Sequence, residues 1–399
     1  MKSILELARP EVRKLIPCVH GGEIWSIARE HDVQHGEVLD FSSNVNPLGP
    51  PLKALEAVKT SSWQIPFYPD SNSTSLKEAI AQYICGITAE NVIIGNGSCE
   101  LIHIFAEAFA DVGAEVLIPT PTFGEYEKAV EKMDGKIKFL PPAPDFKLHS
   151  KDLLDEVNSK TRIVFLCNPN NPTSTLISSE DILEIVEETL RRDILVFIDE
   201  DFMEFVSGKR RFSLADKVGT YQNIFVLRSF TKIFGLTGLR VGYGVACREI
   251  IEVLSKAKIP WNVNCLAQVA AAAALQDLEY LGKTEKLIEE EKAFLLNELS
   301  RVDGFRVFPA DANFIFIDIR QSGLTASRLK QKMLEHGILI RDCSSFTGLD
   351  EYYIRIAVRT RRENERLLES VRKIALNSLE ILRMTESLPQ RLEECSFRA

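Results

Sequence analysis

Twelve residues near the middle of the chain, Ser229 to Arg240, gather side chains well suited to chemistry. The stretch follows an apolar run, Ile224 to Leu227, that is typical of a buried strand. A lysine can form a Schiff base with an aldehyde, and a hydroxyl and an arginine can hold a phosphate dianion. The glycines let backbone come close to a bound group. These features are what a pyridoxal 5'-phosphate (PLP) site needs, with Lys232 as the point of attachment.

A Ser-x-x-Lys alone is more often an ordinary loop with a surface lysine, so its interpretation depends on the rest of the chain. Four more polar clusters each follow an apolar run that predicts a strand, and they contain Ser98, Phe123, Asn171 and Asp199. In an open, mainly parallel α/β sheet, ligands bind at the carboxyl ends of the strands. We therefore expect these four side chains to meet Ser229 and Lys232 at one edge of a sheet.

The elements that must position these residues alternate between strand and helix up to about residue 246. The predicted strands cover 91–94, 115–118, 162–166, 194–198, 224–227 and 241–246. Beyond about residue 262 the pattern changes to an Ala-rich helix over 264–281, which can bridge two domains, a charged helix over 285–299, and short strands. Those strands are expected at 305–308, 313–319, 338–341 and 352–358.

This order predicts an α/β protein with two domains. Residues 46–275 form a large domain with a mainly parallel sheet, and residues 276–374 form a smaller α+β domain. Residues 1–45 are predicted to be an N-terminal arm that joins the smaller domain, and residues 375–399 a C-terminal extension.

The smaller domain carries an unusual set of arginines. Arg355 lies inside the predicted strand 352–358, where a charge without a partner is costly to bury. The partner of Arg355 is either a carboxylate of the protein, in a buried salt bridge, or the carboxylate of a substrate. Arg341 ends the preceding strand and is either a surface ion pair or a second anion site. The turn at His20-Gly21-Gly22 is either incidental or places a histidine near an anionic group.

Bulk properties exclude several classes of protein. The net charge of −9 argues against nucleic acid as a partner, and no apolar run approaches the length of a membrane span. The N-terminus lacks the apolar core of a signal peptide. The eight cysteines contain no Cys-x-x-Cys pair, so we expect reduced thiols in a cytoplasmic protein and no metal site.

Taken together, the motifs resemble those of a known family. They are Gly95-x-Gly97-Ser98, Cys167-Asn168-Pro169-Asn170-Asn171-Pro172-Thr173, Asp199-Glu200, and the run from Ser229 to Tyr243. As a set they are similar to fold-type I PLP-dependent enzymes of the aspartate aminotransferase superfamily, over roughly residues 20 to 375. The resemblance implies PLP as the cofactor and a large domain with a smaller C-terminal one.

The resemblance also implies roles for individual residues in cofactor binding. Lys232 would hold PLP and shuttle a proton, and Asp199 would keep the pyridine nitrogen protonated. Asn171 would donate to the ring oxygen, and Phe123 would stack on the ring. The phosphate would be bound by a group of residues around the first glycine-rich turn and the lysine loop: Gly97, Ser98, Ser229 and Arg240.

Further implied roles concern the substrate and a second subunit. Tyr68 would reach the cofactor phosphate from the other subunit of a homodimer. Arg355 would bind a substrate carboxylate, and Arg341 a substrate phosphate, with His20 as a second candidate. The irregular segment 40–51, rich in Asn, Pro and Gly, would line the substrate cleft through Asn46 and Gly49.

Within the superfamily the chain is closest to two enzyme families, histidinol-phosphate aminotransferase and L-threonine-O-3-phosphate decarboxylase of the cobalamin pathway. The segments 20–22, 41–51, 341–349 and 353–361 favour the decarboxylase, with a phosphorylated amino acid as substrate. An aminotransferase stays the alternative, because the sequence lists the anion-binding residues without their geometry. Threonine phosphate and serine phosphate are not distinguished either. A cofactor-free binding protein is disfavoured, because Lys232 is present.

Two positions depart from the family pattern. Relatives often have tyrosine where this chain has Phe202, so a hydroxyl contact to the ring oxygen is lost. The usual Asn-Pro-Thr-Gly is Asn171-Pro172-Thr173-Ser174 here, which constrains the turn but removes no ligand.

Overall fold

The computed structural model describes residues 3–30 and 38–376, which form two compact units. The first unit comprises the described parts of Met1–Val19, Val45–Leu287 and Phe346–Gly348. The second comprises those of His20–Asn44, Ile288–Ser345 and Leu349–Ala399. Each unit is described by itself.

These units differ from the predicted domains in three places. The N-terminal arm is divided, because Met1–Val19 belongs to the first unit and only His20–Asn44 to the second. The later boundary falls between Leu287 and Ile288, inside a helix, and not at residue 275. Phe346–Gly348 returns to the first unit, where Thr347 donates a hydrogen bond to Glu127 at 3.0 Å. The predicted extension 375–399 lies almost wholly outside the described residues.

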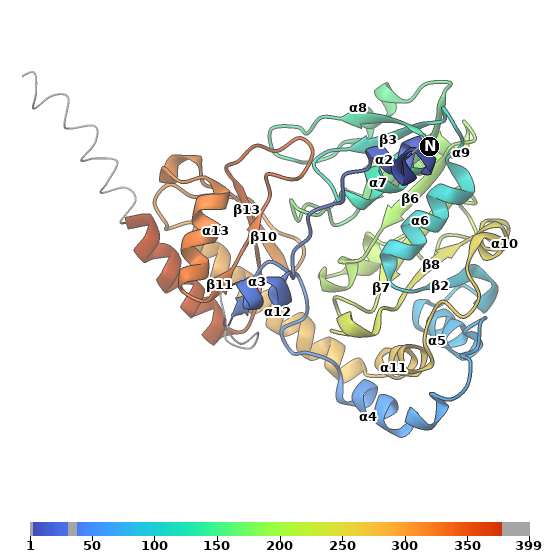
Figure 1. The fold of residues 1–399 in the computed structure, drawn as a ribbon, viewed down its shortest axis with the longest axis horizontal. Helices are drawn as coiled ribbons and strands as arrows, with labels where there is room; N and C mark the ends of the chain where they lie inside the picture. Colours follow the sequence, from blue (N-terminus) through green and yellow to red (C-terminus); the bar gives the residue numbers. More distant parts are fainter. Residues whose placement is uncertain (1–2, 31–37, 377–399) are drawn as a thin grey trace, which may run out of the picture. The chain divides into compact units, whose positions relative to one another are not determined.

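Among the described residues, seven strands form the central sheet of the first unit, in the order β2-β8-β7-β6-β5-β3-β4 (Figure 1). Every neighbouring pair is parallel except those of β8, which runs antiparallel to both β2 and β7. The strands are β2 (Val92–Gly95), β3 (Glu115–Pro119), β4 (Lys136–Leu140), β5 (Thr161–Cys167), β6 (Leu195–Asp199), β7 (Ile224–Ser229) and β8 (Gly242–Ala246). The prediction of a mainly parallel sheet is confirmed.

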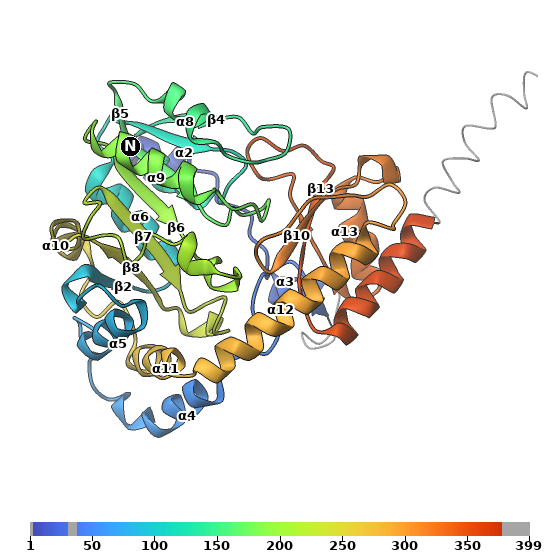
Figure 2. The ribbon, with the colours of Figure 1, turned by 180° about the vertical axis from the view of Figure 1, so that it is seen from behind.

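Helices cover both faces of this sheet, with α6 on one face and α9 on the other (Figures 1 and 2). Apolar residues of α6 recur every three or four positions, and Leu101, Ile102 and Phe105 are fully buried against the sheet. The helices of this unit are α1 (Ile4–Leu7), α2 (Pro10–Lys14), α4 (Leu52–Thr60), α5 (Thr74–Ile84), α6 (Ser98–Phe109), α7 (Glu125–Lys132), α8 (Ser150–Glu156), α9 (Ser179–Leu190), α10 (Arg248–Ala257) and α11 (Cys265–Leu275).

The second unit is built on an antiparallel sheet in the order β12-β13-β10-β9. These strands are β9 (Arg306–Val307), β10 (Phe314–Asp318), β12 (Arg341–Asp342) and β13 (Tyr353–Ala357). A separate parallel pair joins β1 (Leu39–Asp40) to β11 (Ile338–Leu339). The helices are α3 (Ile24–Glu30), α13 (Ala326–Glu335), a helix over 361–376, and the second half of α12 (Leu278–Leu299).

Two predicted elements are wrong in detail, and an edge strand of the central sheet was not predicted. The single helix expected over 264–281 is two helices, because the Asp277 carboxylate accepts a hydrogen bond from the Tyr280 amide and starts α12 as a new helix. The strand expected over 338–341 is divided between β11 and β12, which belong to different sheets. No strand was expected over Lys136–Leu140, whose apolar residues are interleaved with lysines, yet β4 pairs there as an edge strand.

None of the helices in the described part of the chain combines the length and the apolar run that crossing a membrane requires.

Candidate active site

The strand register brings the predicted cofactor residues to one edge of the central sheet. Four strands, β3, β5, β6 and β7, point the same way, so the segments that follow their carboxyl ends begin at the same edge. Asp199 ends β6 opposite Leu227, and Ser229 ends β7 opposite Gly242. Because β8 is antiparallel, Arg240 lies at this edge as well, immediately before β8 begins. The topology therefore brings the segments that follow these strands to one edge of the sheet, as expected.

The lysine loop is held in place by the segment around Asn46. The Asn46 amide donates to the Lys232 carbonyl at 3.0 Å, and its side-chain nitrogen lies 2.8 Å from the Ile233 carbonyl. The same nitrogen contacts hydroxyls of α12, and its oxygen accepts from the Leu48 amide at 3.0 Å. Asn46 is buried and braces the loop, and its role toward the substrate stays a prediction.

Gly49 likewise has a structural part in this loop. Gly235 has φ +61°, and a Cβ added there would lie 2.9 Å from the carbonyl carbon of Gly49. The Gly49 carbonyl accepts a hydrogen bond from the Tyr280 hydroxyl at 2.5 Å. Only glycine fits at residue 235, because the two backbones approach so closely there. This contact fixes the loop that carries Lys232, three residues earlier.

The first turn of α6, the start of β8 and Arg240 form a cradle suited to a phosphate. Gly97 precedes α6 with φ +83°, and a Cβ there would lie 2.6 Å from Nη2 of Arg240. A Cβ at Gly242 would lie 2.8 Å from the Ser98 nitrogen. Free amides at the beginning of a twelve-residue helix, a serine and an arginine together attract an anion.

Asp199 is buried, and both of its oxygens accept hydrogen bonds. The Tyr126 hydroxyl donates to Oδ2 at 2.6 Å, and the Asp201 amide donates to Oδ1 at 2.9 Å. Burial raises the pKa of Asp199 to about 7, and the Asp201 carboxylate adds to the rise, while Tyr126, the Asp201 amide and Lys232 lower it. A protonated ring nitrogen would supply the positive charge that favours ionised Asp199.

Phe123 and Asn171 are carried by loops that are tied to each other. Asn170 receives a hydrogen bond from the Thr122 hydroxyl at 3.0 Å and donates to the Pro121 carbonyl at 2.9 Å. Asn171 is 8% exposed, and the partly buried Phe123 packs edge-on against Tyr126, with ring centroids 5.7 Å apart. Phe123 therefore packs on the tyrosine that binds Asp199, and Asn171 lies in the loop that follows β5.

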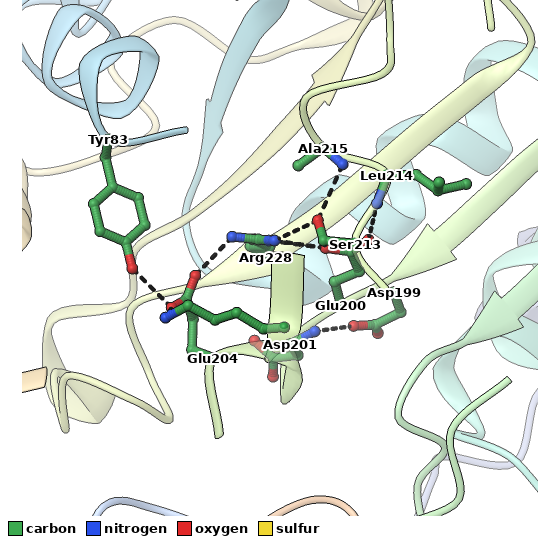
Figure 3. Close-up of polar contacts among 10 residues, drawn as sticks. Tyr83, Asp199, Glu200, Asp201, Glu204, Ser213, Leu214, Ala215 and Arg228 are labelled. Atoms are coloured by element: carbon green, nitrogen blue, oxygen red, sulfur yellow. Dashed lines mark hydrogen bonds and ion pairs between the residues drawn. The ribbon is translucent and has the colours of Figure 1, made fainter. Parts of the chain in front are cut away.

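Behind the sheet edge lies a buried ionic network centred on Arg228 (Figure 3). Arg228 donates to Glu200 Oε2 from Nε and Nη2 at 3.0 and 2.7 Å and to Glu204 Oε1 from Nη1 at 2.6 Å. The two carboxylates receive further donors, which are Ser213, Leu214, Tyr83 and Lys209. Glu200 follows Asp199 and Arg228 precedes Ser229, so the network fixes the two strand ends that carry the site.

In the second unit, Arg341 and Arg355 lie directly opposite each other on β12 and β13. Both are buried, at 6% and 5% exposed. Arg341 donates to the Ser345 hydroxyl at 2.9 Å, and Arg355 donates to the Ser42 carbonyl at 2.6 Å. Burial lowers the pKa of Arg355 to about 10, and the charge of Arg341 contributes to that decrease.

The predicted turn at His20 also belongs to this arginine region. A Cβ at Gly21 would lie 2.4 Å from the Ser42 carbonyl oxygen, and the Gly22 amide donates to Ser42 Oγ at 2.9 Å. Ser42 therefore connects the turn after His20 to Arg355 within the second unit. The two glycines are explained by this close packing.

Tyr68 lies on the surface of the first unit. Its ring is 81% exposed and stacks on Trp261 with centroids 4.7 Å apart. Phe202 is buried and lies 5.9 Å from Nζ of Lys232, so its hydroxyl-free ring borders the lysine.

Sequence reasoning missed Tyr126, Asp201 and the pair Glu200 and Arg228. Tyr126 lies three residues after Phe123 in the same cluster that follows a predicted strand, and this position was a signal for it. Glu200 and Arg228 each neighbour a predicted site residue, and alternation along a strand places them on the opposite face. Only the folded arrangement shows that they meet.

The residues at the sheet edge fit PLP by their chemistry. Lys232 offers the amine, the buried Asp199 offers a carboxylate in need of a positive partner, and the cradle at Gly97 and Arg240 suits a phosphate.

Comparison with known proteins defines the class. Residues 36–371 match the family described as Aminotransferase class I and II, so the chain belongs to this family. The crystal structure of histidinol-phosphate aminotransferase from Sinorhizobium meliloti in complex with PLP superposes with a TM-score of 0.84 at 22% identity, over 93% of this chain and 98% of that one. The predicted fold-type I class is confirmed, and the protein is a PLP-dependent enzyme.

The relatives carry two different enzyme names. Histidinol-phosphate aminotransferase of Methanosphaera stadtmanae is 37% identical over 353 residues, which cover 88% of this chain and 94% of that protein. A protein provisionally named threonine-phosphate decarboxylase, from Caldanaerobacter subterraneus subsp. tengcongensis, is 37% identical over 364 residues, 91% of this chain and 95% of that protein. The aminotransferase name is the more common among the relatives found.

Proposed function

We propose that this enzyme decarboxylates L-threonine O-3-phosphate to (R)-1-amino-2-propanol O-phosphate and CO2, a reaction of cobalamin biosynthesis. The observation that carries the proposal is the pair of buried arginines, Arg341 and Arg355, side by side on neighbouring strands. Two like charges in such positions are costly to bury. A substrate with a phosphate and a carboxylate only a few bonds apart would present one anionic group to each guanidinium.

The residues at the sheet edge then divide the chemistry among them. Bound PLP supplies an electron sink for the charge that develops at the α-carbon. Asp199 holds a proton on the ring nitrogen, and Asn171 donates to the ring oxygen. Ser98, Ser229 and Arg240 bind the cofactor phosphate, while Lys232 holds the cofactor and delivers the proton that replaces CO2. Arg355 orients the substrate carboxylate, and Arg341 holds its phosphate.

The competing candidate is an aminotransferase acting on histidinol phosphate, favoured by the more common name among the relatives. That substrate carries a phosphate and no carboxylate, and one phosphate can also take two arginines. A substrate panel separates the two functions. We expect turnover of L-threonine O-3-phosphate without a keto acid and no amino transfer from histidinol phosphate to 2-oxoglutarate. The reverse pattern would refute the decarboxylase.

The roles of the two arginines can be separated with a substrate that lacks the phosphate. Arg341→Ala is expected to lower kcat/KM for L-threonine O-3-phosphate by roughly 30-fold to several thousand-fold, the equivalent of about 2–5 kcal/mol for removing one partner of a buried charge pair. It should leave the slow reaction of L-threonine unchanged. Arg355→Ala should impair both substrates, because both carry the carboxylate.

Steady-state kinetics with the two substrates checks this prediction. Arg328→Ala, at an exposed arginine of α13, serves as the matched control and should behave as wild type. An equal loss for both substrates in Arg341→Ala would remove that residue from phosphate binding.

We further propose that the active enzyme is a homodimer in which Tyr68 completes the partner's cofactor site. An aromatic patch on the first unit, made of Trp63, Phe67, Tyr68 and Trp261, is more than half exposed at every position. Its rings already pack in pairs, Trp63 edge-on against Phe67 and Tyr68 stacked on Trp261. Exposed apolar surface of this kind marks an interaction site, and a second copy of the chain suits a patch that carries a site residue.

Subunit complementation tests the shared site. We expect that mixing Lys232→Ala with Tyr68→Ala subunits restores activity above that of either variant, because a mixed dimer contains one intact site. Sedimentation of the wild-type chain should show the dimer. Absence of complementation between subunits that do exchange would place Tyr68 outside the partner's site.

A further inference from the structure

The loop after β6 carries a second carboxylate, Asp201, that has no part in the roles assigned above. The hydrogen bond that its backbone amide donates to Asp199 Oδ1 fixes its position two residues beyond Asp199 (Figure 3). One of its own oxygens, Oδ1, is buried, and the described residues provide it with no hydrogen-bond donor. A buried ionised oxygen without a donor is costly, whereas a protonated or newly partnered one is less so.

The surroundings of Asp201 are the residues expected to bind the cofactor. The Ser229 hydroxyl and the charges of Lys232 and Arg240 all favour its ionised form. Burial raises the pKa of Asp201, although Lys232, Ser229 and Arg240 each lower it. The titratable or charged groups that face it come from several elements and are Asp199, Lys232, Arg240, Cys99 and Cys167.

Without cofactor, the charges of the two carboxylates and two cations at this edge balance. The carboxylates are Asp199 and Asp201, and the cations are Lys232 and Arg240. When PLP is bound, its protonated ring nitrogen would pair with Asp199, which leaves Asp201 to face the phosphate. A phosphate dianion held by Ser229 and Arg240 adds negative charge next to Asp201 and takes over the donors that now stabilise its ionised form. Like charges at close range disfavour ionisation, most strongly where burial lowers the local dielectric.

We propose that Asp201 is a second carboxylate of the cofactor site and takes up a proton when PLP binds, so that cofactor loading depends on pH. This inference rests on the assignment of Ser229, Lys232 and Arg240 to the cofactor made under the proposed function. The proton comes from solvent and is returned when the cofactor leaves, so no other reactant is needed.

The direction of the pH dependence follows from the two states of Asp201. Its pKa is higher with the phosphate beside it than without, so PLP affinity is greatest below the pKa of the free protein. Affinity then falls, by at most about tenfold per pH unit, until the pH passes the pKa in the complex. Asparagine imitates the protonated acid at every pH. An Asp201→Asn variant should therefore bind PLP more tightly than wild type at alkaline pH and equally well at acidic pH.

Calorimetric titration of the full-length, cofactor-free chain with PLP tests the inference. Titrations in two buffers that differ in ionisation enthalpy count the protons taken up. The wild-type chain is expected to take up more protons than Asp201→Asn, by up to about one per site. Asp201→Ala should lose the same linked proton, so the test does not depend on one variant. Asp111→Asn, at an exposed carboxylate of the same unit, should keep the wild-type value.

Equal proton uptake and parallel pH profiles in the wild type and both Asp201 variants would overturn the inference. A merely structural role for Asp201 would weaken binding by the same factor at every pH and leave the proton count unchanged. Borohydride reduction, followed by peptide mass analysis, is run alongside. Cofactor trapped on Lys232 together with an unchanged proton count would refute only the role of Asp201. Cofactor trapped on another lysine would refute the site assignment and this inference together.

Discussion

A Lys232→Ala variant is expected to lose covalent attachment of PLP completely and to lose at least about 10²–10⁴-fold in kcat, the range for a positioned acid–base group. The lysine stands at the sheet edge between the phosphate cradle and Asp199, and its loop is braced by Asn46 and Gly49. Without the Lys232 amine, PLP would keep its phosphate and ring contacts but could form no Schiff base at this position. Borohydride reduction with peptide mass analysis and steady-state kinetics measure the two effects.

Lys256→Ala is the matched control, since Lys256 is 73% exposed and pairs with Glu252 on the surface of α10. It should retain cofactor on Lys232 and full activity. An unchanged yield of reduced cofactor–protein adduct in Lys232→Ala would contradict the assignment, whatever happened to activity.

Replacing Arg228 with methionine is expected to lower the free energy of unfolding by about 3–5 kcal/mol, because it leaves two carboxylates buried without their main counter-ion. Glu200 and Glu204 are 0% and 8% exposed. Burial by itself raises the pKa of Glu204, but Arg228 and Lys209 hold it below its usual value. Their stabilising effect is present above the pKa of the unfolded chain and is lost as pH falls through the folded-state value.

Denaturant unfolding at neutral pH measures this loss. The triple variant Arg228→Met, Glu200→Gln, Glu204→Gln should regain most of the stability, because no charge stays buried alone. Arg191→Met removes an exposed pair on the same unit and should change stability by less than about 1 kcal/mol. If Arg228→Met lowers the free energy of unfolding no more than Arg191→Met does, the ionic network does not stabilise the fold. Cofactor affinity should also fall in Arg228→Met, since Arg228 precedes Ser229.

Much of the sheet could be predicted from sequence, because its strands are continuous apolar runs that each end in a polar cluster. Runs such as 162–166 and 194–198 have the composition of strands buried on both faces. The same pattern located Asp199, Ser229 and Lys232, since ligand-binding residues of parallel sheets follow strand ends. β4 escaped prediction because an edge strand with alternating lysines has a weaker apolar signal.

The rest depends on contacts between distant residues that local sequence does not record. Asn46 contacts the lysine loop and α12, more than 180 positions away, and its loop composition gave no sign of these contacts. Tyr126 reaches Asp199 across 73 positions, and Arg228 reaches Glu200 across 28. The division of α12 between two units was hidden because a continuous helix gives no composition break.

The most direct test of the central claim is product analysis with L-threonine O-3-phosphate in the absence of any keto acid. The decarboxylase should release CO2 and (R)-1-amino-2-propanol O-phosphate in equal amounts, over many turnovers per active site. An aminotransferase would release no CO2. It would instead convert one substrate molecule per site, stop, and resume only when 2-oxoglutarate is added, and that result would contradict the proposed function.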